Sequence, residues 1–164
     1  MRVARQMTPD LKVELIEAGH LMNQSGLPHK FIAAAVQTAF EFEGVYNLMK
    51  MWVDEEDQKE RDEIVADIQD LIEDCAQNEK VEGVYVRFDD LETIAKDVRK
   101  FKDNLRMAVD QNGGLKKLSE LTGIPQPSLS RFFGSATMPR RTKLLKIARA
   151  LNLSQIEIAT EWSR

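Results

Sequence analysis

The sequence predicts an all-α protein with two parts, an N-terminal helical domain and a C-terminal domain of five short helices. Along most of the chain, apolar residues recur at the three- and four-residue spacing of amphipathic helices. Only residues 81–88 alternate in the manner of a strand. After Phe101, glycine and proline residues become frequent enough to divide the chain into short helices. We therefore predict domains at 1–88 and 89–164.

The composition is typical of a globular protein of a reducing compartment. The chain has 164 residues, of which 43% are hydrophobic and 30% charged, and such a chain has enough apolar material for a core. No stretch approaches the ~18 apolar residues of a transmembrane helix, and the first residues lack the apolar segment of a signal peptide. The single cysteine excludes an intrachain disulfide. We therefore expect a cytoplasmic protein without a membrane partner.

The first predicted helix begins at a capping signal. Thr8 is the expected N-cap and Pro9 the first helical residue. The segment 24–28, which contains a glycine and a proline, is expected to end the helix. The residues predicted on its apolar face are Leu11, Leu15, Ala18 and Met22.

Two further helices are predicted before residue 80. One spans about 29–52, and Gly44 is expected to bend or split it. Its predicted apolar face is Ile32, Val36, Ala39 and Phe40. The other begins in the acidic run 54–57, because carboxylates favour the positive end of a helix dipole. Its predicted apolar face is Ile64, Ile68, Leu71, Ile72 and Cys75, which implies a buried, unreactive cysteine.

The segment 81–108 leaves two structural alternatives open. Residues 81–88 form either an extended linker, which we favour, or a strand that pairs with its copy in a second subunit. A helix then begins at a capping box on Asp89. Its first apolar residues, Leu91, Ile94 and Val98, are a tentative dimer seam, and the next, Phe101, Leu105 and Ala108, are expected in the C-terminal core. We favour packing within the protein over a coiled coil, because the pattern is shorter than three heptads.

Charge is distributed unevenly along the chain. The formal net charge is −4 overall, but residues 54–80 carry twelve acidic and three basic side chains, a net charge of −9. Residues 101–164 carry eleven basic and five acidic side chains, a net charge of +6. A basic unit attached to an acidic one is the electrostatic pattern expected when only the basic part binds phosphate. A run of acidic residues is more often a solvated face than a site, although it also suits a basic partner.

The C-terminal part contains a predicted helix-turn-helix. A short helix ends at Thr122 and Gly123, where glycine adopts a positive φ without steric cost. The next helix, 126–133, is entered through two prolines. Ile124 and Leu129 are expected to hold it against the core, which leaves its N-terminal residues facing outward.

Over about residues 101–162 the chain resembles the lambda-repressor-like, or Xre-type, helix-turn-helix family. The similarity is carried by Leu118-Ser-Glu-Leu-Thr-Gly-Ile-Pro-Gln-Pro-Ser-Leu-Ser-Arg-Phe-Phe, by Met138-Pro139, and by Leu144-Leu-Lys-Ile-Ala-Arg-Ala-Leu-Asn-Leu153. The resemblance implies a five-helix domain that binds double-stranded DNA as a dimer and regulates transcription. It also implies that the helix 126–133 enters the major groove.

The resemblance and the chemistry of the side chains together give candidate contacts. The residues expected at the base edges are Gln126, Pro127, Ser128, Ser130 and Arg131. Those expected at DNA phosphates are Lys116, Lys117, Thr137, Arg140, Arg141 and Lys143. For Lys143 and Lys146, a position on a solvated helix face explains the basic side chain at least as well as a contact with DNA phosphate does. Phe132 and Phe133 are expected in the core rather than between bases.

No catalytic, metal-binding or cofactor-binding pattern is evident, so we expect neither an enzyme nor a cofactor. The N-terminal domain, 1–88, matches no pattern that we recognise, and its role is to dimerise, to sense a ligand or to bind a partner protein. The favoured function is a dimeric transcription repressor. The first alternative is an antitoxin whose N-terminal helices neutralise a toxin while the C-terminal domain represses its own operon. The second alternative is a helix-turn-helix that contacts protein rather than DNA.

Overall fold

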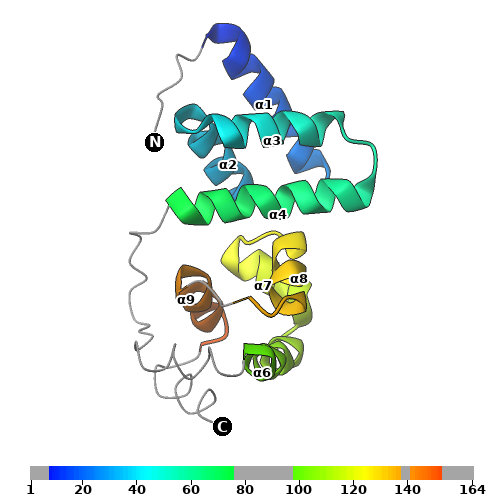
Figure 1. Cartoon of the computed structure of the whole chain (residues 1–164), viewed down its shortest axis with the longest axis vertical. Helices are drawn as coiled ribbons and strands as arrows, with labels where there is room; N and C mark the ends of the chain where they lie inside the picture. The colour runs from blue at the N-terminus through cyan, green and yellow to red at the C-terminus, as the bar shows by residue number, and fades with distance from the viewer. Residues whose placement is uncertain (1–7, 76–97, 138–140, 153–164) are drawn as a thin grey trace. The chain divides into compact units, whose positions relative to one another are not determined.

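The computed structural model describes residues 8–75, 98–137 and 141–152 (Figure 1). These residues form eight α-helices and no strand, so the described part of the chain is all-α as predicted. The chain divides into two compact units. The N-terminal unit contains α1–α4 and also the segment Gly123–Ser128, and the C-terminal unit contains the remaining described residues of α6–α9.

The first helix, α1 (Pro9–Gln24), follows the prediction closely. Thr8 is the N-cap, and its hydroxyl accepts a hydrogen bond from the Leu11 N–H at 3.4 Å. Pro9 occupies the first turn, where its missing N–H costs no hydrogen bond. The residues that α1 buries are Leu15, Ala18, Gly19 and Met22. The predicted break is confirmed, because α1 ends at Gln24 and the next helix begins at His29.

The predicted helix over 29–52 is split into α2 (His29–Glu41) and α3 (Glu43–Asp54). The split falls at Phe42, whose backbone is extended (φ −134°, ψ 109°), and not at Gly44. Gly44 still matters, because a Cβ at that position would lie 2.7 Å from the Phe42 ring. The glycine therefore leaves room for the ring to fold back over the first turn of α3.

The apolar face predicted for this segment is partly wrong. Helix α2 buries Phe31, Ala35 and Ala39, whereas Phe40 is 38% exposed. Residues at four-residue spacing share a face of a helix, so burial of Phe31, Ala35 and Ala39 turns the adjacent Phe40 outward. Helix α3 contributes Val45, Tyr46, Met49 and Trp52 to the core.

The fourth helix, α4 (Gln58–Cys75), begins just after the acidic run 54–57, and not within it as predicted. Asp57 caps it, because its Oδ1 accepts hydrogen bonds from the N–H groups of Lys59 (2.8 Å) and Glu60 (3.1 Å). Ile64, Ile68 and Ile72 are buried, as expected. The prediction of a buried Cys75 is wrong: it is exposed, because it is the last residue of the helix and the buried face ends before it.

Among the described residues, the core of the N-terminal unit is formed by side chains of α1–α4 and their connections. Figure 1 shows α3 and α4 as antiparallel neighbours joined by a short loop. That loop is held by Arg61, whose Nε donates to the Glu55 carbonyl at 2.5 Å. The Arg61 guanidinium lies 4.5 Å from the centre of the buried Trp52 ring. Arg61 therefore links the start of α4 to the end of α3.

The helices that follow α4 in the described part of the chain are α6 (Val98–Gln111), α7 (Gly114–Thr122), α8 (Gln126–Gly134) and α9 (Arg141–Ala150). Helix α7 packs against both α6 and α9. Phe101 and Leu105 are buried, as predicted, and Ala108 is half-buried. From α9 the buried residues include Leu144, Ile147 and Ala148.

Several predictions fall on residues outside the described part of the chain. They concern the strand or linker at 81–88, the domain boundary at residue 88, and the fifth C-terminal helix after Ser154. Of the tentative dimer seam, Leu91 and Ile94 lie outside it too, and Val98 is the half-buried first residue of α6. Within the described residues, no helix has both the length and the apolar character needed to cross a membrane.

Candidate nucleic-acid interface

Helices α7 and α8 are consecutive and joined by a short turn, which is the connectivity of a helix-turn-helix. Each has nine residues, and the turn between them consists of Gly123, Ile124 and Pro125. Gly123 has a φ of +75°, in the left-handed region that favours glycine. The Thr122 hydroxyl donates to the Leu118 carbonyl at 2.7 Å, within the last turn of α7. The turn therefore has the sharp geometry that the glycine predicted.

Buried apolar residues fix the orientation of α8. Ile124 and Leu129 are almost fully buried, as predicted. Phe132 and Phe133 are also buried, which confirms that they belong to the core. Their ring centres lie 4.9 Å apart at an interplanar angle of 85°, an edge-to-face arrangement that stabilises aromatic pairs. One side of α8 therefore packs against the core along the length of the helix.

Two cations of α6 hold the C-terminal end of α8. Arg99 donates from Nη2 to the Phe133 carbonyl and is paired with Asp103 at 2.9 Å. Lys102 donates from Nζ to the Ser135 carbonyl (3.0 Å) and to the Ser135 hydroxyl (3.2 Å). The last carbonyls of a helix lack partners within the helix, and positive charge favours this negative end of the dipole. Helix α6 therefore fixes the position at which α8 ends.

Three basic side chains, of which Lys102 is one, lie against the rings of the aromatic pair. The Lys102 ammonium lies 4.5 Å from the centre of the Phe132 ring, and the Lys143 ammonium 5.6 Å from it. The Arg106 guanidinium lies 5.6 Å from the centre of the Phe133 ring. Cations are attracted to the negative faces of aromatic rings, more so where water is excluded. The sequence analysis missed this arrangement, although the spacing of the basic residues on α6 (99, 102 and 106) is that of a single helix face.

The predicted base-contacting residues differ in their exposure. Gln126 and Ser130 are exposed on α8, whereas Pro127 and Arg131 are half-buried. Ser128 is only 2% exposed, so it does not lie on the accessible surface of the helix.

The residues predicted to contact phosphate also differ in their exposure. Lys116 and Lys117 are exposed on the first turn of α7, and Thr137 is exposed after α8. Lys143 is 5% exposed, with its ammonium near the Phe132 ring, so its prediction as a surface phosphate contact is wrong. Arg140 lies outside the described residues, and Arg141 is described only as the first residue of α9.

Burial lowers the pKa of Lys102. Desolvation, with smaller contributions from the charges of Arg99 and Lys143, lowers the pKa of Lys102 from 10.5 to about 8. Between these pH values the unfolded chain keeps a proton that the folded unit has released. The contribution of Lys102 to stability is therefore constant below pH 8 and rises as the pH increases from about 8 to about 10.5.

We expect Lys102→Met to remove this pH dependence. As the pH increases from 8 to 10.5, the free energy of unfolding of the unchanged chain should increase relative to that of the variant. Urea denaturation of both proteins across this range measures the difference. Lys116→Met, on the exposed part of α7, controls for the loss of one lysine. A difference between the unchanged chain and Lys102→Met that is independent of pH would contradict the prediction.

Comparison with known proteins finds no matching family model, no similar curated protein and no similar solved structure. Among the described residues, no group of three or more His, Cys, Asp or Glu side chains is placed to hold a metal ion. The function of the helix-turn-helix is therefore argued from its own residues.

Proposed function

We propose that the chain is a sequence-specific DNA-binding transcription regulator that contacts the major groove through α8. The observation that carries this proposal is the helix-turn-helix itself. Its turn contains Gly123 at positive φ, its second helix is held by Leu129, and Gln126 is exposed at the first position of that helix. In helix-turn-helix proteins the N-terminal part of the second helix contacts base edges.

The exposed side chains of α8 suit base contacts. A glutamine such as Gln126 donates to adenine N7 and accepts from N6, and an arginine such as Arg131 donates to guanine O6 and N7. Gln126 lies at the start of α8, and Ser130 follows one turn later, also exposed. Ser128 is no longer part of the proposed surface because it is buried.

Basic residues outside α8 supply the non-specific part of the proposed binding. Lys116 and Lys117 are exposed on α7, the helix that precedes the turn. Residues 101–164 carry a net charge of +6, although the whole chain carries −4. Phosphate contacts of this kind release counterions, so the affinity of DNA binding falls as the salt concentration rises.

The resemblance to lambda-repressor-like domains further supports a dimer that represses transcription. A dimer places two copies of α8 in successive major grooves on one face of the duplex. Its binding site is then a palindrome with half-sites separated by about one helical turn, roughly 34–36 Å.

Substitutions should separate base contacts from phosphate contacts. Gln126→Ala and Arg131→Ala are expected to weaken binding to a selected site about 5- to 150-fold each, with little effect on random duplex, because each removes a bidentate base contact of about 1–3 kcal/mol. Lys116→Ala should weaken binding to both duplexes equally and reduce the salt slope by about one. Fluorescence anisotropy of labelled duplexes, titrated at several salt concentrations, measures both effects.

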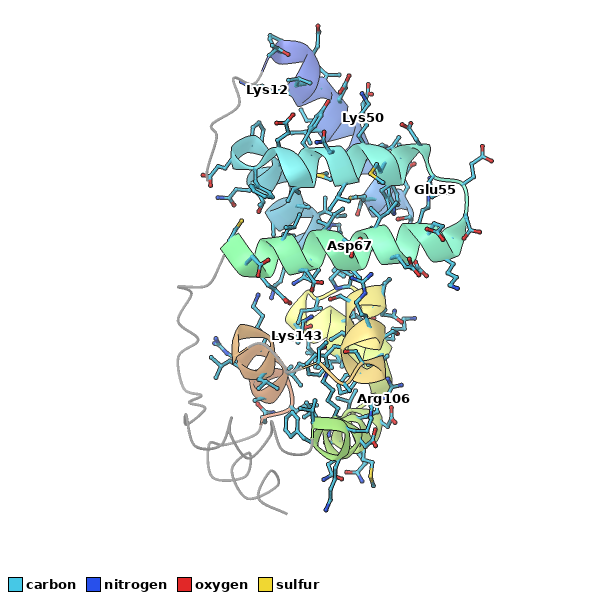
Figure 2. All side chains as sticks on the ribbon, in the orientation of Figure 1. Lys12, Lys50, Glu55, Asp67, Arg106 and Lys143 are labelled. Atoms are coloured by element: carbon cyan, nitrogen blue, oxygen red, sulfur yellow. The ribbon has the colours of Figure 1, made fainter. Side chains whose placement is uncertain are left out.

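The matched controls lie in the N-terminal unit. Gln37→Ala on α2 and Lys12→Ala on α1 make the same exchanges at exposed positions (Figure 2 labels Lys12) and should change neither affinity. An equal loss on both duplexes with Gln126→Ala would contradict its proposed role in base contact.

A further inference from the structure

A cavity of about 230 Å³ lies between α1 and α3, within the N-terminal unit. Its apolar lining includes Leu15, Ala18 and Met49, which are buried. Leu21 also lines it and is 40% exposed, so the cavity reaches the surface. Pockets for drug-sized ligands are larger, roughly 300–1,000 Å³. The cavity therefore has room for a small apolar group that enters from solvent.

The charged residues of the cavity are mostly acidic. Glu14, Glu17 and Asp54 line it, and Lys50 is the basic residue of the lining (Figure 2 labels Lys50 on α3). All four are exposed, so their charged groups lie toward solvent while the cavity wall beneath them is apolar. A carboxylate excess of this kind favours a positively charged ligand and disfavours an anion.

One carboxylate is held in place by the cavity wall. The hydroxyl of Tyr46, a buried residue that lines the cavity, donates a hydrogen bond to Oε2 of Glu14. A carboxylate accepts several hydrogen bonds, so Glu14 retains acceptor capacity for an ammonium group. Because the hydrogen bond fixes the Glu14 side chain against α3, less rotamer freedom is lost when a ligand binds.

We propose that this cavity binds a small organic cation, an apolar body that carries one ammonium group. The apolar body fills the space beside Ala18 and Met49, and the ammonium group lies at the exposed rim of the cavity, beside the carboxylates that line it. This inference does not rest on the proposed DNA binding, because the cavity belongs to α1 and α3 alone. Its test is therefore a direct measurement of ligand binding.

The experiment compares three probes that share a phenyl ring and differ in the charge of their polar group. Benzylamine, benzyl alcohol and benzoate are titrated into the ¹⁵N-labelled full-length chain, and backbone amide shifts are followed by NMR. We expect saturable shifts centred on Ala18, Leu21 and Met49, with a dissociation constant on the order of millimolar for a ligand of so few atoms. Benzylamine should bind roughly three- to tenfold more tightly than benzyl alcohol, and benzoate most weakly.

A double variant tests the role of charge without disturbing the core. Glu17→Gln with Asp54→Asn neutralises two of the three carboxylates that line the cavity, and we expect it to reduce the preference for benzylamine at least twofold while leaving the affinity for benzyl alcohol within about twofold. Glu41→Gln with Asp10→Asn makes the same exchanges at exposed positions outside the lining and should preserve the preference. Shifts that do not saturate, or a preference for benzylamine that is unchanged in the Glu17/Asp54 variant, would overturn the proposal.

Discussion

Phe132→Ala is expected to destabilise the C-terminal unit by about 3–5 kcal/mol, as truncation of a buried phenylalanine usually does. The change removes the edge-to-face contact with Phe133 and leaves a cavity beneath the ammonium groups of Lys102 and Lys143. Because the free energy of unfolding of a domain is only about 5–15 kcal/mol, a loss of this size removes much of its stability. Hydrogen exchange of the full-length chain should show faster exchange throughout α6–α9.

Two controls isolate this effect. Phe40→Ala makes the same exchange at a residue that is 38% exposed, and its cost should be much smaller. The described core residues of the N-terminal unit belong to α1–α4 and their connections and do not include Phe132, so Phe132→Ala should change exchange in those helices much less than in α6–α9. Protection in α6–α9 that matches that of the unchanged chain would show that Phe132 does not hold this unit together.

Trp52→Ala should have an effect of similar size in the other unit, about 3–5 kcal/mol. The Trp52 ring is buried and contacts the Arg61 guanidinium, which also donates to the carbonyls of Glu55 and Val53. Without the ring, the core loses a large apolar group and Arg61 loses the surface that positions it. Exchange should therefore accelerate in α1–α4, and most of all at the junction of α3 and α4.

The conservative variant Trp52→Phe serves as the control for Trp52→Ala. It retains an aromatic ring for the core and for the Arg61 guanidinium, so it should cost clearly less than Trp52→Ala. Equal destabilisation by the two variants would contradict the role assigned to the ring. Acceleration spread evenly over α1–α9 would contradict the separate cores of the two units.

Local signals in the sequence predicted most of the helices correctly. The cap at Thr8 and Pro9, the acidic start of α4 and the turn at Gly123 all depend on the backbone chemistry of a few adjacent residues. The split of the helix predicted over 29–52 was expected at Gly44 but falls at Phe42, whose ring packs where a Cβ on residue 44 would lie, and a pattern of spacings does not contain this side-chain contact.

Burial at the candidate site was harder to predict, because it depends on tertiary packing. The spacing correctly placed Leu129, Phe132 and Phe133 in the core. It did not show that Lys102 and Lys143 are buried beside Phe132, since long basic side chains are normally expected at the surface. The contacts that fix the C-terminal end of α8 join residues more than 30 positions apart in the sequence.

Selection from a random duplex library with the purified full-length chain, followed by sequencing, tests the proposed DNA recognition most directly. We expect enrichment of a palindrome whose half-sites lie about one helical turn apart, as a dimer with α8 in successive major grooves requires. The absence of any enriched sequence at low salt, where phosphate contacts are strongest, would contradict a DNA-binding function for the helix-turn-helix.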